Sequence, residues 1–151
     1  MLLINNVILG QQVKETLLNG HSAIIPVKGS SMYPFLRNNR DLVTLKSPRP
    51  EDLRPGRIVF FQQGEKYILH RIIRKTNDLF LIRGDNRRDT SYEYVPEKNI
   101  IGYVSIIHRD GKKISCDNYL WRIISKVWII ATPIRLWLYP IMKHFRERRQ
   151  T

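Results

Sequence analysis

The sequence contains a single cysteine, Cys116, among its 151 residues. One cysteine excludes an internal disulfide and argues against a structural zinc site, which needs several cysteine or histidine ligands. Acidic residues are also few, with 13 against 26 lysines and arginines, for a net charge of +13. This excess predicts an anionic partner, nucleic acid or a phospholipid surface, or else a solvated basic face. We expect no metal and no cofactor.

The chain also lacks a hydrophobic run long enough to cross a membrane. The longest uncharged piece of its apolar C-terminal segment, Val127 to Ile134, falls well short of the roughly 18 residues of a spanning helix. At the other end, "MLLINNVILG" has no basic region and is interrupted by asparagines, which disfavours a signal peptide. Residues 1–20 instead predict a short amphipathic helix that ends at Gly20.

Residues 21–116 consist of short β-prone runs separated by turn residues. "RIVFF" and "YILHRIIRK" flank the loop "QQGEK", and Asp110-Gly111 is a strong tight-turn dipeptide. No internal repeat interrupts this pattern. The sequence therefore predicts a mainly β protein, in which residues 1–118 form one compact antiparallel domain that includes the N-terminal helix.

Residues 119–151 differ in composition from the rest and form a basic, tryptophan-rich tail. We expect Pro133 to divide this tail into two amphipathic helices, because proline disrupts a helix interior. Tryptophans beside lysines and arginines suit a helix lying in a membrane interface, and the alternative is a tail folded onto the β domain. The residues predicted to contact the membrane are Trp121, Trp128, Trp137, Arg122, Lys126 and Arg135.

Candidate catalytic residues occur in three separate segments. "VKGSSMYPFL" carries the adjacent serines Ser30 and Ser31, and "YILHRII" carries His70. "GDNRRDTSYEYVPEKNIIG" carries Asp85 and Asp89. A serine hydroxyl becomes a good nucleophile when a base removes its proton and a third group orients that base. Each segment alone is also compatible with an ordinary turn or strand.

Taken together, these three segments resemble the signal peptidase family of serine endopeptidases, within the S24/S26 superfamily. The resemblance covers about residues 24–104. It implies the antiparallel β fold that signal peptidases share with self-cleaving repressors. It also implies that Ser31, which directly precedes Met32, is the nucleophile, and that His70 is the base, as in the endoplasmic reticulum-type branch. Asp89 best matches the orienting acid, with Asp85 as the runner-up.

The resemblance also implies an oxyanion hole and a class of substrate. The backbone N–H of Ser31 would stabilise the developing charge, with Ser30 as a second donor, because Gly29 stands where some relatives carry a hydroxyl. The substrate would be a peptide or protein precursor, cut in an extended leader or signal segment after a small residue. We expect a membrane-associated protein, with a cytoplasmic location as the alternative.

Two other functions compete with this one. A self-cleaving repressor shares the fold but uses lysine as its base, and no Ala-Gly or Cys-Gly cleavage site precedes Ser31. A non-catalytic basic β module would bind membrane lipid or nucleic acid. The β region has no recognisable RNA-binding signature, so nucleic acid is the less favoured partner.

Overall fold

The computed structural model describes residues 2–147, so Met1 of the predicted N-terminal helix and residues 148–151 of the predicted tail lie outside it. Within this range the chain forms two α-helices, two short 3-10 helices and eight strands. The helices are α1 (Leu2–Leu18) and α2 (Tyr119–Glu147), and the 3-10 helices are η1 (Pro50–Asp52) and η2 (Glu97–Asn99). The strands are β1 (Ala23–Pro26), β2 (Asp41–Lys46), β3 (Ile58–Gln63), β4 (Lys66–Lys75), β5 (Phe80–Arg83), β6 (Glu93–Val95), β7 (Ile100–Arg109) and β8 (Lys112–Ser115).

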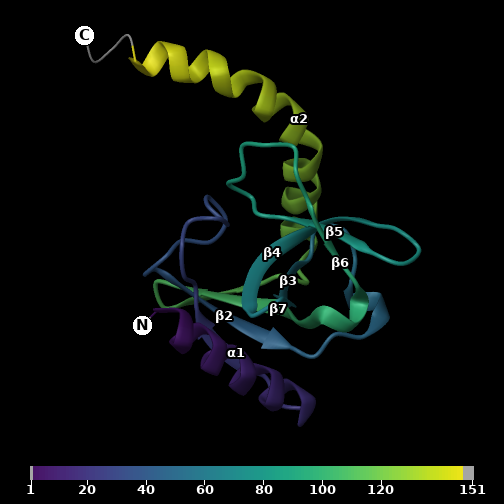
Figure 1. Ribbon diagram of the computed structural model, residues 1–151. Helices are drawn as coiled ribbons and strands as arrows, with labels where there is room; N and C mark the ends of the chain where they lie inside the picture. Colours follow the sequence, from purple (N-terminus) through teal and green to yellow (C-terminus); the bar gives the residue numbers. More distant parts are fainter. Residues whose placement is uncertain (1, 148–151) are drawn as a thin grey trace.

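All described strands belong to one sheet, in which every pairing is antiparallel. The strand order is β1-β2-β7-β3-β4-β5-β6, and β8 pairs with β7. The helix α1 packs at one side of this sheet, and α2 leaves it from the opposite side (Figure 1). The predicted mainly β fold with a helix at each end is confirmed.

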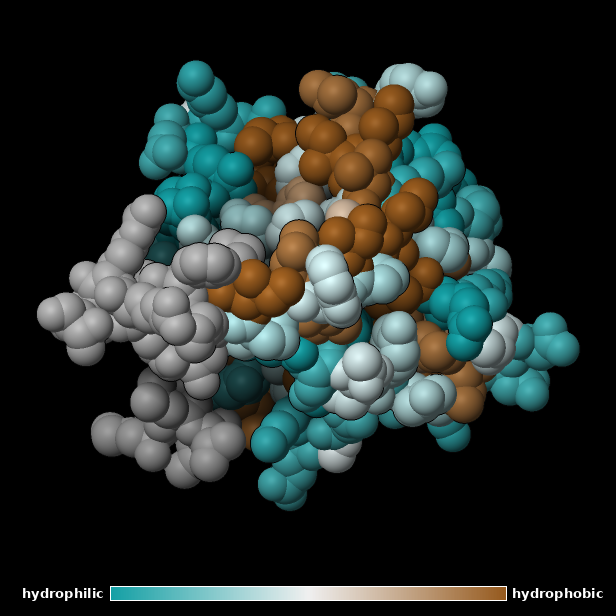
Figure 2. All heavy atoms as spheres, turned by 90° about the horizontal axis from the view of Figure 1, so that it is seen from above, coloured by the Kyte–Doolittle hydropathy of each residue, from teal (hydrophilic) through white to brown (hydrophobic). Residues whose placement is uncertain are grey.

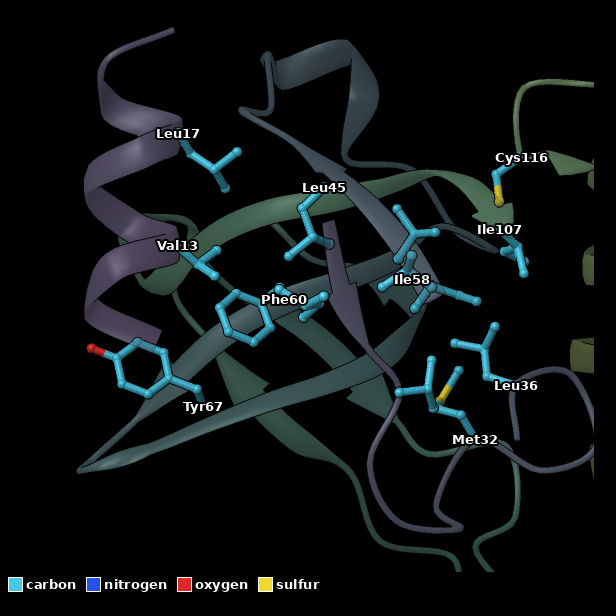
Figure 3. Close-up of a cluster of buried hydrophobic side chains, with 14 residues drawn as sticks. Val13, Leu17, Met32, Leu36, Leu45, Ile58, Phe60, Tyr67, Ile107 and Cys116 are labelled. Carbon is cyan, nitrogen blue, oxygen red and sulfur yellow. The ribbon is translucent and has the colours of Figure 1, made fainter. Parts of the chain in front are cut away.

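The sheet has a hydrophobic cluster on each face, because successive side chains of a strand point to opposite faces. Phe60 of β3 joins the cluster under α1, whereas its neighbour Phe61 joins the other one. In the first cluster, Leu17 of α1 lies at one side and Met32 lies at the other (Figure 3). The segment after β1 is therefore anchored in the same core as the N-terminal helix.

The helix α2 continues through Pro133 and also contains Pro140, so the predicted break at Pro133 is wrong. A proline removes one backbone hydrogen bond and crowds the preceding turn, which kinks a helix but need not end it. The axis of α2 changes direction between the part on the β domain and its far end (Figure 1). Within residues 2–147, no helix is both long and apolar enough to cross a membrane.

One face of α2 packs on the β domain. The rings of Trp121 and Trp128 contact Phe35 edge-on, with centroid distances of 5.5 and 5.1 Å. Ser125 lies between them and is buried. Arg135 places its guanidinium 3.4 Å from the centre of the Trp128 ring. Three residues predicted to contact a membrane therefore lie on the face that packs against the protein.

The outer face of α2 is apolar and exposed. Its described members are Leu120, Ile123, Val127, Ile130, Ile134, Trp137 and Ile141. Seen from above, the end of the molecule at which α2 lies in Figure 1, the surface carries a contiguous hydrophobic patch (Figure 2). Arg122 and Lys126 are exposed beside this face, and Trp137 lies in it.

A buried carboxylate holds the start of β2. Asp41 is 2% exposed and accepts hydrogen bonds from the backbone N–H of Arg37 and from the guanidiniums of Arg40 and Arg109. Burial alone would raise the pKa of Asp41, but these donors outweigh it and hold the pKa far below its usual range. The charged form is therefore the one that stabilises the fold.

This depressed pKa makes stability sensitive to acid. Asp41 contributes stability above the ordinary aspartate pKa of about 3.9, and the contribution is lost as pH falls below that value. We expect Asp41→Asn to lower the free energy of unfolding at pH 7 by about 1.5–3 kcal/mol and to flatten its dependence on pH below about 4. Urea unfolding from pH 3 to pH 7 measures both effects. The exposed Asp78→Asn is the matched control, and an equal loss in that variant would contradict the assignment.

Candidate active site

Ser31 lies on a turn whose neighbouring residues are held in the core. Met32 and Leu36 are 3% and 0% exposed, whereas Ser31 is exposed. The N–H of Leu36 donates to the carbonyl of Met32 at 2.9 Å, and the N–H of Tyr33 donates to that of Ser30 at 3.1 Å. Met32 thus anchors the turn and leaves the hydroxyl of Ser31 at the surface.

A second loop, which follows β5, fixes the same turn from the other side. The backbone N–H of Asn86 donates to the carbonyl of Ser31 at 2.9 Å, and its side-chain amide donates to the carbonyl of Ser30 at 3.1 Å. These bonds join segments separated by more than 50 residues, since Ser30 and Asn86 are 56 apart. The Gly-Asp-Asn segment is therefore part of the support for Ser31.

His70 of β4 and the backbone of Ser31 both lie close to Gly84. A methyl group added to the α-carbon of Gly84 would lie 2.8 Å from the carbonyl oxygen of Ser31 and 3.0 Å from Nε2 of His70. Both groups thus converge on one small residue, whose lack of a side chain permits the approach. The backbone carbonyl of Ser31 and the imidazole of His70 therefore lie close to each other around Gly84.

The acid beside His70 is Glu93 of β6. Its Oε2 lies 3.4 Å from Nδ1 of His70, the ring nitrogen away from Gly84, and both side chains are nearly buried. Within residues 2–147, neither atom makes a hydrogen bond, so their 3.4 Å approach is a contact of polar groups and not a formed hydrogen bond. Burial of Glu93 would raise its pKa, but His70 and Arg87 outweigh burial and hold the pKa below its ordinary value. Glu93 is therefore a carboxylate at neutral pH.

Sequence reasoning missed Glu93, although the sequence carries a signal for it. Along β6, Tyr94 is exposed and Val95 is buried. Alternation places Glu93 on the same side as Val95. A glutamate at a core-facing position of a strand needs a charged partner, because an unpaired buried carboxylate is costly. The pattern alone does not say that this partner is His70.

Neither aspartate predicted to orient the base contacts it. Both carboxylate oxygens of Asp85 accept bonds of 2.8 Å from Arg71, in a pair that is almost fully buried. Asp89 is exposed and binds Ser91 and Arg87. Hydrogen bonds from Ser91 lower the pKa of Asp89. Their roles in orienting a base remain predictions, and the geometry favours Glu93 in their place.

The backbone around Ser31 offers a donor for an oxyanion. Among the described residues, the N–H of Ser31 donates to no protein acceptor. Gly29 precedes the two serines with φ of 76°. The predicted donors, the Ser31 N–H and Ser30, thus lie at the exposed end of the turn. No group of three or more metal-ligating side chains occurs in residues 2–147.

An exposed serine, a histidine and a carboxylate are the three groups that a serine peptidase requires. Residues 7–105 match the family model described as Peptidase S24-like, which covers more than half of the chain. The protein therefore belongs to the Peptidase S24-like family. No curated protein matched the chain. The helix α2 lies outside the region that the family model matches.

Gly84 provides a test of this geometry. We expect Gly84→Ala to cost about 1–3 kcal/mol of stability, because the added methyl group overlaps Ser31 and His70. It should also move the imidazole of His70, which NMR of the ring protons detects. Gly111→Ala is the control, since its methyl group meets open space and costs only backbone strain. Unchanged His70 signals in Gly84→Ala would contradict the described approach.

Proposed function

We propose that the protein is a serine endopeptidase in which Ser31 is the nucleophile, His70 the general base and Glu93 the orienting acid. The observation that carries this proposal is that the carbonyl oxygen of Ser31 and Nε2 of His70 both lie against Gly84, with Glu93 3.4 Å from Nδ1. Family membership supports a peptidase or a self-cleaving relative. The histidine base and the particular acid are our assignment.

In this mechanism, Nε2 of His70 accepts the proton of the Ser31 hydroxyl as Oγ attacks the scissile carbonyl carbon. The imidazolium then donates that proton to the leaving amine, and the peptide bond breaks to leave an acyl group on Ser31. Water, deprotonated by His70, hydrolyses the ester and restores the enzyme. Catalytic hydrogen bonds are often long in the free enzyme, so a 3.4 Å contact suits a resting site.

Glu93 and the Ser31 backbone stabilise the charges that form. In the reacting site, the Glu93 carboxylate accepts a hydrogen bond from the Nδ1–H group of His70, which selects the tautomer whose Nε2 is free to act as a base. The Ser31 N–H, with Ser30 as the second donor, faces the developing oxyanion. Removing one such donor raises the activation free energy by about 3 kcal/mol in related hydrolases.

The substrate in this proposal is a separate precursor peptide, bound in extended form and cut after a small residue. The packing of α1 supports cleavage of another chain. Val13 and Leu17 of α1 are buried in the cluster at the end away from Met32 (Figure 3). The helix α1 is therefore fixed on the sheet away from Met32, the neighbour of Ser31, which argues against a scissile bond within this helix.

The identity of the orienting acid gives the sharpest test. We expect Glu93→Gln to lower kcat by about 10²-fold or more, because an amide cannot stabilise the imidazolium. Asp89→Asn should change kcat by less than about twofold, because Asp89 is exposed and binds Ser91. The assay is cleavage of a library of extended peptides with central alanine or serine, followed by mass spectrometry of the fragments.

Ser31→Ala and His70→Ala should abolish cleavage in the same assay, and circular dichroism checks that each variant is folded. Full activity of either variant would contradict the mechanism. A large loss in Asp89→Asn with none in Glu93→Gln would restore Asp89 as the acid.

We also propose that the outer face of α2 lies in a membrane interface. Ile130 and Trp137 are 73% and 70% exposed on this face, and Arg122 and Lys126 flank it. Exposed apolar side chains beside cations suit the boundary between lipid headgroups and acyl chains. In this proposal Trp121 and Trp128 are no longer membrane contacts, because both pack on Phe35.

Vesicle binding tests this face. We expect the double variant Ile130→Ser, Trp137→Ser to bind vesicles of phosphatidylcholine and phosphatidylglycerol at least about tenfold more weakly, because it loses two apolar anchors. Leu18→Ser is the control, since Leu18 is 75% exposed on α1. Co-sedimentation measures the bound fraction. Equal binding of native protein and double variant would contradict the proposal.

A further inference from the structure

A cavity of about 320 Å³ lies beside the turn that carries Ser31. Three segments line it: Tyr33 and Pro34 of that turn, the loop from Asp85 to Arg88, and α2 between Trp128 and Tyr139. Asn86 also lines the cavity, and it is the residue that binds the carbonyls of Ser30 and Ser31. The cavity therefore shares a wall with the proposed active site.

Arg135 of α2 is an uncompensated cation in this wall. Its guanidinium stacks on Trp128, donates to the hydroxyl of Thr132 at 2.7 Å, and makes longer bonds to the carbonyls of Trp128 and Asp85 at 3.4 and 3.5 Å. Its buried Nε has no acceptor, and no carboxylate lies within ion-pair distance in the described part of the chain. Burial lowers the pKa of Arg135, although Asp85 acts in the opposite direction. The surroundings thus hold the side chain in place without neutralising it.

The nearby carboxylates already form ion pairs with other arginines. Asp85 binds Arg71 through both oxygens, and Glu93 binds Arg87 at 2.7 Å. Arg88, at the rim of the cavity, contacts the ring and the hydroxyl of Tyr139 and has no ion-pair partner among residues 2–147. Two guanidiniums therefore face a cavity that lacks a matching anion.

We propose that this cavity is a substrate subsite that binds an acidic side chain, glutamate or aspartate, of the peptide near its scissile bond. The inference rests on the proposed peptidase function. Arginine is a strong carboxylate ligand, and a guanidinium already held by stacking and hydrogen bonds loses little freedom when it binds one. Leu136, Leu138 and Tyr33 add apolar walls, so the preferred peptide carries an apolar residue beside the acid.

The position of the cavity limits where that acid falls. An extended peptide advances about 3.3 Å per residue, and the cavity begins two residues from Ser31, at Tyr33. The acidic residue therefore lies within a few positions of the bond that is cut. Because α2 lies outside the region matched by the family model, the contribution of Arg135 to this specificity comes from a part of the chain that the family model does not cover.

Binding to an inactive variant tests the subsite without requiring cleavage. The protein is Ser31→Ala, and the probe is a library of fluorescent decapeptides with central alanine and either glutamate or glutamine at each flanking position. We expect glutamate to bind at least about tenfold more tightly than glutamine at one or two positions, measured by fluorescence polarisation. Adding Arg135→Gln should reduce this ratio to about one, and Arg88→Gln should reduce it in part.

The control is Arg74→Gln, because Arg74 is an exposed cation of β4 that does not line the cavity, and it should leave the ratio unchanged. An equal effect in Arg74→Gln, or no glutamate preference at any position, would overturn the subsite. An unchanged ratio in Arg135→Gln with weaker binding to phosphatidylglycerol vesicles would assign the cavity to a lipid phosphate instead. If the preference is present but native protein cuts no peptide, the peptidase proposal fails and the subsite stands.

Discussion

The buried guanidinium of Arg71 holds the parts of the site together. Its side chain is fully buried, and its donors bind both oxygens of Asp85, the carbonyl of Gly56 and the hydroxyl of Ser125, while Phe35 covers its face. A buried charge is tolerated when paired and fully hydrogen-bonded, and losing one partner is costly. Arg71 therefore fixes the loop after β5, the helix α2 and the turn of Ser31 relative to one another.

The same strand supplies the proposed base one residue earlier. His70 and Arg71 are consecutive in β4, so their side chains point to opposite faces. Two consecutive residues after β5 contact them: Gly84 lies against His70, and Asp85 binds Arg71. His70 and Gly84 therefore belong to the proposed reactive site, whereas Arg71 and Asp85 support it.

Much of this architecture could be predicted from sequence, because alternating apolar runs and turn dipeptides define an antiparallel domain locally. The placement of Ser31 and His70 came from a resemblance, and Glu93 was missed because its contact with His70 depends on how β6 pairs with β5. The packing of the inner face of α2 on the β domain could not be predicted from the sequence either. Trp121 and Trp128 have the composition of a membrane anchor, yet they fill space against Phe35, which no pattern within the helix reveals.

The central claim, a nucleophilic Ser31 activated by His70, is tested most directly by covalent capture. A peptidyl diphenyl phosphonate ending in alanine forms a stable ester with an activated serine and releases phenol. Peptide mapping by mass spectrometry should place the adduct on Ser31 of the native protein and find almost none in His70→Ala. An adduct on Ser30, or undiminished labelling of Ser31 without His70, would contradict the account.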